Sequence, residues 1–316
     1  MSHVVVMKPG LLTTIQDRGR WGLQAHGVPV AGPMDPCSHR LANALAGNDV
    51  DAATLEVTLT GPELEFDDER VIAVAGAEFE LTVDGRSVPP NAAFVVTSGS
   101  RLRFGRRVRG ARAYLAMSGG VACAPVLGSR ATHVISGMGG LDGRPLKAGD
   151  RVPLGDPMRA RRTMSAQPLS PIFALPEGHA VIRVIAGPQQ DYFAADALDA
   201  LQSAQYAISN ASDRMGFRLK GPVLTHTRGA DIISDATPLG ALQVPASGQP
   251  ILLMADRQTT GGYPKIATVI AADISVAGQL APGDAISFSV CSPHEALAAL
   301  IAQERALMAV EASAAS

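Results

Sequence analysis

Short alternating strands separated by turn residues fill the chain from residue 54 onwards, and this pattern constrains the fold more than any other feature. Leu55, Val57 and Leu59 alternate with more polar neighbours, which is the period of two that β-strands show. The dipeptide Asp84-Gly85 is typical of a tight hairpin turn. Closely spaced short strands with such turns predict a mainly β chain, folded as a barrel or a sandwich. Further strands are expected at 63–66, 71–75, 78–83, 93–97, 101–104 and 113–117.

Length and composition indicate how many such units the chain contains. The chain has 316 residues, of which 47% are hydrophobic, enough for one large or two medium domains. The segment 156–180 is rich in proline and arginine and lacks periodicity, and a second strand series begins at residue 181. We therefore expect an N-terminal domain at 1–165, a linker at 166–180, a C-terminal domain at 181–300 and a C-terminal helical tail at 301–316.

Two segments carry helix signals within this β pattern. Pro36–Gly47 starts with a proline suited to a first helical turn and ends with a glycine suited to a C-terminus. From Ser292, a residue type that caps helix N-termini, the apolar spacing becomes helical. The sequence thus predicts a few helices added to a β framework.

Charge, cysteine content and hydropathy exclude several classes of protein. The 27 basic and 29 acidic residues nearly balance, which argues against binding of nucleic acid through bulk charge. The three cysteines are scattered and form no metal-binding spacing, which fits a reducing compartment. No run of about 18 apolar residues could span a membrane, and no secretory signal is evident. We expect a cytoplasmic protein that uses neither nucleic acid nor membrane as a partner.

A polar loop between two apolar runs carries the densest set of reactive side chains. The runs are 251–254 and 266–270, and loops held by a rigid scaffold often carry binding and catalytic groups. The same segment also fits a polar β-hairpin with capping hydroxyls. The candidate groups are Asp256, Arg257, Gln258, Thr259, Thr260, Gly261, Gly262, Tyr263 and Lys265.

On chemistry alone, these groups suggest a site for a carbonyl compound or an anion. Lys265 can anchor a negative charge or transfer a proton. Asp256 can accept hydrogen bonds from the N–H pair of a urea-like group. The hydroxyls of Thr259 and Thr260, with the backbone amides at 261–262, can bind a carbonyl or phosphate oxygen.

Other segments carry more polar chemistry than packing requires, and each has a structural alternative. Asp17 with Arg18 and Arg20 either holds an anion or forms a solvated turn with a local ion pair. Glu56 interrupts an apolar strand, so it either faces solvent or meets a cation or amide in a site that includes Asp35.

Two arginines four residues apart, Arg214 and Arg218, either line one edge of a cleft or lie on an exposed basic turn. The familiar nucleotide, hydrolase and zinc sequence patterns are absent, and the seven histidines lack metal-ligand spacing. From its residues alone, the chain is a mainly β protein with a polar site of open chemistry.

Several blocks of sequence resemble the biotin-dependent carboxyltransferase-like family, which includes the 5-oxoprolinase C-subunit, KipI antagonist and allophanate hydrolase subunit 2. One block is Gly27-Val28-Pro29-Val30-Ala31-Gly32-Pro33-Met34-Asp35, and the longest is the loop at 254–266. Residues 234–237 depart from the family, reading Ser-Asp-Ala-Thr where Ser-Glu-Gly is usual. The remaining matching blocks are 9–17, 55–62, 128–130, 139–146, 212–216 and 243–245.

The resemblance implies two cyclophilin-like β-barrel domains facing each other across a cleft. It implies an ATP-dependent enzyme that opens 5-oxo-L-proline to L-glutamate together with two partner subunits, one KipI-like and one LamB/YcsF-like. ATP would serve the complex, while this chain lacks a biotin-attachment segment and is expected to hold no biotin and no metal. By residue, the resemblance implies catalytic roles for Lys265, Tyr263, Asp256 and Arg257, and substrate binding by Gln258, Thr259, Thr260, Gly261, Gly262, Arg214, Arg218, Glu56 and Asp35.

Two alternative functions stay open at this point. One is a regulatory binding protein that antagonises a KipI-like kinase inhibitor. The other is allophanate hydrolase subunit 2, or a carboxyltransferase subunit related to urea carboxylase. Activity of the chain mixed with its partner subunits discriminates between a component of an enzyme and a purely regulatory protein.

Overall fold

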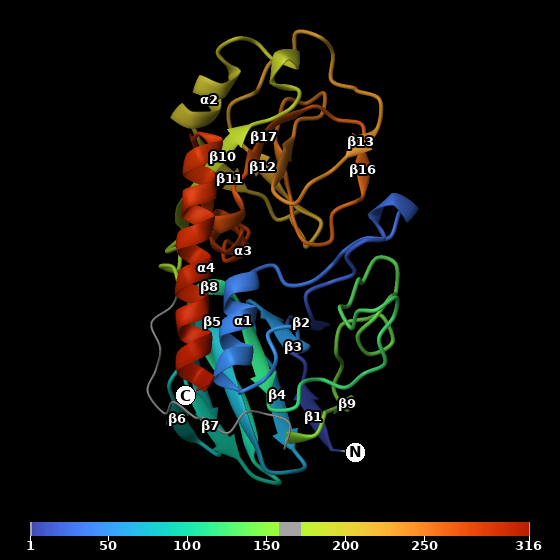
Figure 1. Ribbon diagram of the computed structural model, residues 1–316, viewed down its shortest axis with the longest axis vertical. Coiled ribbons are helices and arrows are strands. Elements are labelled where there is room, and N and C mark those ends of the chain that lie inside the picture. The colour runs from blue at the N-terminus through green and yellow to red at the C-terminus, as the bar shows by residue number, and fades with distance from the viewer. Residues whose placement is uncertain (1, 158–171, 316) are drawn as a thin grey trace. The chain divides into compact units, whose positions relative to one another are not determined.

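The computed structural model describes residues 2–157 and 172–315, which form two compact units (Figure 1). The N-terminal unit comprises Met1–Arg20, Ala31–Leu175 and Arg305–Ser316, and the barrel unit comprises Trp21–Val30 and Pro176–Glu304. The expected domain ranges, 1–165 and 181–300, differ from these units: residues 21–30 belong to the barrel unit although they lie within the first range. Residues 166–171 of the expected linker lie outside the described residues.

A curled nine-stranded sheet forms the N-terminal unit and has the shape of a half-barrel. Its main path runs β2-β3-β8-β4-β1-β9, and β5 pairs with β6, β7 and β8. The strands are β1 (His3–Lys8), β2 (Leu12–Gln16), β3 (Thr54–Thr58), β4 (Glu63–Phe66), β5 (Arg70–Val83), β6 (Arg86–Val88), β7 (Ala93–Val96), β8 (Arg101–Met117) and β9 (Arg151–Pro153).

Two of these strands are longer than the sequence pattern predicts. The expected strands 71–75 and 78–83 are one strand, β5, and those at 101–104 and 113–117 are one strand, β8. The pairing between β5 and β8 shifts register between Gly76 and Leu81. Such bulges interrupt the alternation of side chains without ending the strand, so the pattern broke while the strand continued.

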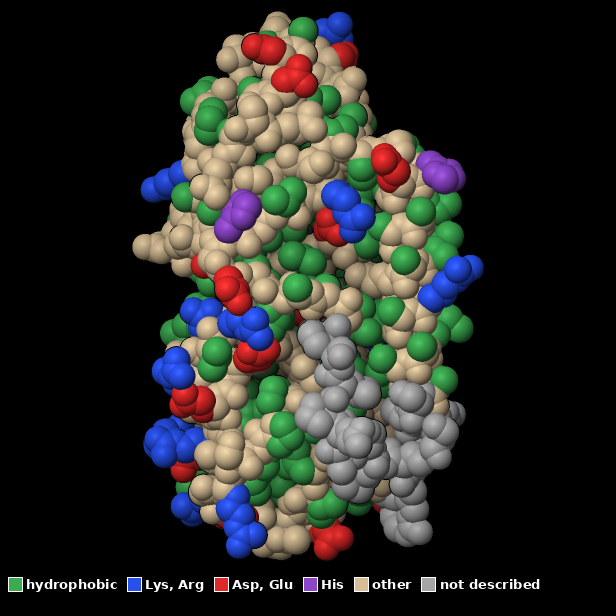
Figure 2. Space-filling view, turned by 90° about the vertical axis from the view of Figure 1, so that its left-hand side faces the viewer, with side chains coloured by type: hydrophobic (Ala, Val, Ile, Leu, Met, Phe, Trp, Pro, Cys, Tyr) green, Lys and Arg blue, Asp and Glu red, His purple; other side chains and the backbone are tan. Residues whose placement is uncertain are grey.

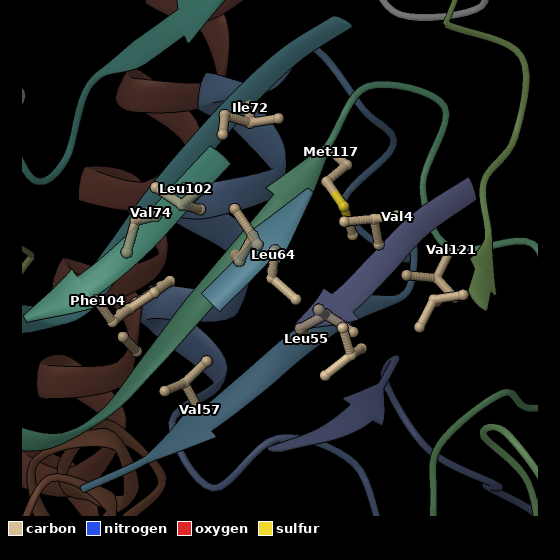
Figure 3. Packing of buried hydrophobic residues seen from close by; sticks show 14 of the residues in the cluster. Val4, Leu55, Val57, Leu64, Ile72, Val74, Leu102, Phe104, Met117 and Val121 are labelled. Carbon is tan, nitrogen blue, oxygen red and sulfur yellow. The ribbon is translucent and has the colours of Figure 1, made fainter. Parts of the chain in front are cut away.

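The main core of the N-terminal unit lies on one face of this sheet. Figure 3 shows Leu55 and Val57 of β3 packed among aliphatic side chains of β1, β4, β5 and β8. Every residue of β3 is buried, including Glu56, because its other face is covered as well. On that second face, Glu56 lies opposite Tyr114 of β8, which belongs to a smaller cluster in which helix α1 (Pro36–Leu45) packs on β5 and β8 (Figure 1).

The predicted helix at Pro36–Gly47 is confirmed, although it ends at Leu45. Asp35 is its N-cap: the carboxylate accepts hydrogen bonds from the Ser38 backbone N–H at 3.0 Å and from the Ser38 hydroxyl at 2.6 Å. Pro36 then occupies the first turn, where its missing N–H has no helical partner to lose.

A closed seven-stranded barrel forms the second unit, in the order β10-β17-β14-β15-β12-β11-β18. Closure comes from parallel pairing of β10 with β18, and the remaining contacts are antiparallel. The strands are β10 (His179–Ala186), β11 (Gln205–Ile208), β12 (Gly216–Lys220), β14 (Ala241–Gln243), β15 (Ile251–Leu253), β17 (Lys265–Val269) and β18 (Ala285–Val290).

Short elements decorate the barrel unit. A separate two-stranded ribbon joins β13 (Asp235–Ala236) to β16 (Thr260–Gly261). The helices are α2 (Ala197–Ser203), α3 (Ile274–Gly278) and the 3-10 turns η1 (Gln24–His26), η3 (Gln190–Tyr192) and η4 (Ala271–Asp273).

The C-terminal helix α4 (Pro293–Ala315) begins where the sequence predicts. The Ser292 hydroxyl accepts from the Glu295 N–H at 3.2 Å while the Glu295 carboxylate accepts from the Ser292 N–H at 2.7 Å, which is a capping box. Within residues 2–157 and 172–315, no helix is long and apolar enough to cross a membrane. The mainly β fold class is confirmed, with one closed barrel and one half-barrel sheet.

A buried histidine makes the stability of the N-terminal unit depend on pH. His39 of α1 is 1% exposed, its Nε2 lies 3.3 Å from the Gln16 carbonyl oxygen, and its Nδ1 has no hydrogen-bond partner among the described residues. Burial lowers the pKa of His39 from 6.5 to about 4. The unfolded chain therefore binds the extra proton between these pH values, and stability falls as the pH falls from 6.5 to 4.

We expect this histidine to account for a loss of up to about 3 kcal/mol of unfolding free energy across that range. Urea unfolding at several pH values measures the loss. His39→Gln, whose amide can still donate to Gln16, should flatten the pH dependence, whereas His294→Gln at an exposed position should not. An unchanged slope in His39→Gln would contradict the assignment.

Candidate functional site

The loop at 254–266 connects two neighbours of the same barrel strand, since β15 and β17 both pair with β14. Within the loop, β16 pairs with β13 and holds Gly261 opposite Asp235. A Cβ on Gly261 would lie 2.5 Å from Nε2 of Gln243, so a larger residue at this position would require the Gln243 side chain to shift. The loop is thus anchored to two distant segments, and its side chains point in different directions.

A buried ion pair fixes the start of the loop. Asp256 accepts two hydrogen bonds from Arg214, with Nε at 2.9 Å and Nη2 at 3.0 Å. The side chains of Asp256 and Arg214 are 4% and 6% exposed, respectively. The Asp256 N–H also donates to the Arg214 carbonyl oxygen. This bidentate geometry occupies the carboxylate that was predicted to meet a substrate and makes it an anchor of the loop.

A second ion pair lies at the end of the loop, where Lys265 begins β17. Its ammonium donates to the Asp235 carboxylate at 2.8 Å, and the lysine side chain is 1% exposed while that of Asp235 is 52% exposed. The hydrogen bond from Lys265 lowers the pKa of the Asp235 carboxyl. The Lys265 backbone N–H donates to the Gln189 side chain at 3.2 Å. Asp235 thereby links the buried cation to solvent.

Two cavities of the barrel unit adjoin the loop, and Gln258 lines both. The first, which we call the Arg257 cavity, measures about 530 Å³. It is lined by Trp21, Gln24, Val30, Ala236, Thr237, Pro238, Leu239, Arg257, Gln258 and Thr259.

The second cavity, the Gln243 cavity, measures about 360 Å³. The side chain of Gln243 is buried, and its Oε1 accepts a hydrogen bond from Nε2 of Gln258 at 3.1 Å. Nε2 of Gln243 has no hydrogen-bond partner among the described residues. Tyr263, 40% exposed, and the exposed Arg218 lie at this cavity. The full lining is Asp213, Met215, Gly216, Arg218, Gln243, Pro245, Ile251, Leu253, Gln258 and Tyr263.

The structure groups the predicted loop residues by their contacts. Asp256 pairs with Arg214, Arg257 and Thr259 line one cavity, and Tyr263 and Arg218 line the other. Thr260 and Gly261 belong to strand β16, and the Gly262 carbonyl oxygen accepts from the Ile232 N–H. Lys265 lines neither cavity in the described part of the chain. The predicted catalytic roles of these residues stay predictions.

Glu56 and Asp35 belong to the N-terminal unit and are joined there through Tyr114. Glu56 accepts from the Met34 N–H at 2.8 Å and from the Tyr114 hydroxyl at 2.7 Å, and that hydroxyl accepts from the Asp35 N–H at 2.8 Å. Burial, followed by the Glu56 and Asp35 charges, raises the pKa of Tyr114 well above 10. These bonds explain how Glu56 is tolerated at 1% exposure.

The Asp17 segment is neither a solvated turn nor a local ion pair, since Asp17 and Arg20 are buried and Arg18 pairs with the distant Asp51. Asp17 accepts from the backbone N–H groups of Gly19 and Arg130 and from the Ser129 hydroxyl. Arg20 is 1% exposed and donates to backbone carbonyl oxygens, including that of Val126. These contacts hold the loop at 126–131 and leave anion binding by this segment without support.

Sequence reasoning missed four residues of the barrel unit that shape the candidate site. Asp235 and Thr237 lie in the stretch 234–237, which departs from the family pattern, and Gln243 lies in the matching block 243–245. Neither the departure nor the match indicates which residues these side chains contact. Trp21 lies in the segment 16–22, in which the charged residues carry the only clear sequence signal. Their roles depend on pairing of β13 with β16 and on placement of segment 21–30, which no local pattern predicts.

Metal sites and charged binding surfaces each require a particular grouping of side chains. No group of three or more His, Cys, Asp or Glu side chains in residues 2–157 and 172–315 is arranged to hold a metal ion. On the face drawn in Figure 2, basic and acidic side chains lie beside one another and are not gathered by sign.

Comparison with known proteins assigns the family. A family described as "Carboxyltransferase domain, subdomain A and B" matches residues 26–290, and this chain belongs to that family. It is 39% identical over 300 residues to the 5-oxoprolinase C-subunit of Escherichia coli (strain K12), covering 95% of each chain. The Haemophilus influenzae protein of the same name is 35% identical over 283 residues, covering 90% of this chain and 89% of that one.

A solved structure supports the fold over the whole length. The Kluyveromyces lactis urea amidolyase structure matches with a TM-score of 0.90 and 32% identity over 98% of this chain. The match covers only 20% of that larger chain. The family and fold expected from the sequence are confirmed.

Proposed function

We propose that this chain is a subunit of an ATP-dependent 5-oxoprolinase that acts with two partner subunits, one KipI-like and one LamB/YcsF-like. The reaction breaks the lactam C–N bond of 5-oxo-L-proline. Water supplies a hydroxyl to the carbonyl carbon and a proton to the nitrogen, giving L-glutamate. Cleavage of ATP to ADP and phosphate, by a second water, accompanies ring opening.

One observation carries this proposal: relatives named as the 5-oxoprolinase C-subunit match at 39% and 35% identity over nearly their full lengths. The matches leave no large part of those relatives unaccounted for. We also propose that the complex works in the cytoplasm, where ATP is available, because Cys37, Cys123 and Cys291 are all free thiols.

The residues of this chain would bind and orient the lactam and hold charge near it. The Arg214–Asp256 pair fixes the start of the loop. Hydrogen-bond donors of the loop are therefore already in position before the substrate binds. Gln258, which lines both cavities, offers a side-chain amide that can bind the lactam. Lys265, paired with the half-exposed Asp235, supplies a cation that can stabilise developing negative charge or pass a proton.

The direct test mixes the purified chain with both partner subunits, 5-oxo-L-proline and ATP, and measures glutamate. Omitting this chain should abolish glutamate formation. If the mixture forms no glutamate although the three chains co-purify, the regulatory alternative gains support and the enzymatic proposal fails.

The structural match to urea amidolyase favours one second candidate, a carboxyltransferase subunit that acts on a urea-like acceptor. It requires a biotin-carrying partner, since the matched region is about a fifth of that protein's chain. Carboxylation of urea by the chain with such a partner, and no glutamate from 5-oxo-L-proline, would select this candidate.

A further inference from the structure

An arginine without a carboxylate partner lies at the Arg257 cavity. Arg257 is 8% exposed, and its only hydrogen bond in the described residues runs from Nε to the Thr237 carbonyl oxygen at 2.9 Å. Arg214, the other buried arginine of the barrel unit described above, differs because it has Asp256 as its counter-ion. A buried cation without a counter-ion is costly, and burial lowers the pKa of Arg257.

The guanidinium is held in position by Thr237, which also lines the cavity. Thr237 donates its N–H to the Thr259 carbonyl oxygen at 3.1 Å and its hydroxyl to the Gln258 carbonyl oxygen. Together with the bond from Arg257 to its carbonyl oxygen, Thr237 makes three hydrogen bonds to the loop at 254–266. One of the five guanidinium N–H donors is used, and the donors on the two terminal nitrogens have no partner among the described residues. A site fixed in this way loses little ordering entropy when a ligand arrives.

The remaining walls of the cavity are largely apolar. Val30, Pro238 and Leu239 line it, together with the indole of Trp21. The uncharged polar residues of the lining are Gln24, Thr237, Gln258 and Thr259. A cavity of about 530 Å³ with apolar walls and few polar groups is typical of small-molecule sites. The arrangement fits a ligand with one anionic end and a compact uncharged body.

We propose that the Arg257 cavity binds the carboxylate of a small organic acid, with Arg257 as the bidentate partner and the apolar walls around the acid's uncharged body. Arg257 is the only basic side chain that lines the cavity among the described residues. One carboxylate neutralises one guanidinium, whereas a phosphate dianion would leave excess negative charge against apolar walls. Resting on the function proposed above, the acid is 5-oxo-L-proline, whose lactam ring is the uncharged body.

Trp21 provides a direct readout, because it is the only tryptophan in the chain and lines this cavity. Titrating the purified full chain with 5-oxo-L-proline should change its tryptophan fluorescence saturably. The same lactam without a carboxylate, 2-pyrrolidinone, and inorganic phosphate should bind at least about tenfold more weakly, since a charged hydrogen-bonded pair is lost or mismatched. Calorimetry with the same three compounds provides a second measurement.

Arg257→Gln should weaken 5-oxo-L-proline binding at least about tenfold, with little effect on 2-pyrrolidinone. Arg228→Gln is the matched control, since Arg228 is an exposed arginine of the same unit, paired with Asp191. Circular dichroism checks that each variant folds. If Arg257→Gln does not fold, the comparison between the two lactams on the unaltered chain still decides the proposal.

Several outcomes overturn the proposal: equal binding of the two lactams, tighter binding of phosphate, unchanged binding in folded Arg257→Gln, or no saturable signal up to about 10 mM by either method. The reconstituted enzyme separates this proposal from the proposed function. Glutamate formation with an unchanged KM in Arg257→Gln refutes the carboxylate site alone. Carboxylate-dependent binding without glutamate formation refutes the oxoprolinase function alone.

Discussion

Replacing Asp256 by asparagine is expected to lower the free energy of unfolding by about 3–5 kcal/mol, because it removes the charge that compensates a buried guanidinium. Asp256 and Arg214 are 4% and 6% exposed and share two hydrogen bonds of about 3 Å. Asparagine keeps the size of the side chain but offers one acceptor oxygen and no negative charge, so the Arg214 guanidinium loses the carboxylate of Asp256. Urea unfolding followed by circular dichroism measures the change.

An exposed ion pair of the same unit provides the control for this prediction. Asp191 and Arg228 have side chains that are 53% and 61% exposed, so Asp191→Asn should cost about 1 kcal/mol or less. The double variant Arg214→Met/Asp256→Leu should be more stable than Asp256→Asn, since it removes both buried charges together. A small effect of Asp256→Asn, similar to that of Asp191→Asn, would show that the buried pair does not anchor the loop.

The fold was predictable where side-chain alternation and helix caps are local properties. The strand pattern predicted a mainly β chain, and Asp35-Pro36 and Ser292-Pro293 mark the starts of α1 and α4. Closure of one sheet and not the other depends on long-range pairing. In the barrel unit, β10 pairs in parallel with β18, about a hundred residues later, and no local pattern encodes that contact.

The candidate site was predictable in its location but not in its contacts. The polar loop contains the right residue types, yet its ion pairs join positions 42 and 30 residues apart, Arg214 with Asp256 and Lys265 with Asp235. These partners follow from the pairing of β12 with β15 and of β13 with β16. Glu56 shows the same limit, since its buried carboxylate accepts hydrogen bonds from Met34 and Tyr114, which lie 22 and 58 residues away in the sequence.

Replacing Lys265 by methionine is expected to lower kcat of the reconstituted oxoprolinase by at least about 100-fold, the lower range for loss of a proton-transfer or charge-stabilising group. Lys265 is 1% exposed, and its ammonium meets Asp235 at the end of the loop. Methionine has a similar length and no charge, so the variant tests the ammonium and leaves the packing of β17 largely intact. Glutamate formation measures the effect.

Three companion measurements separate a chemical role of Lys265 from a structural one. Lys220→Met, at an exposed position of β12, should keep full activity. Asp235→Asn leaves the ammonium in place without its anchor, so it should retain more activity than Lys265→Met and shift the pH profile of kcat. Lys265→Met should unfold within about 1 kcal/mol of the unaltered chain, since its partner Asp235 is half exposed and stays solvated. Full activity of a folded Lys265→Met would show that Lys265 takes no part in the reaction and has a structural role only. The reaction would then be expected at one of the two cavities.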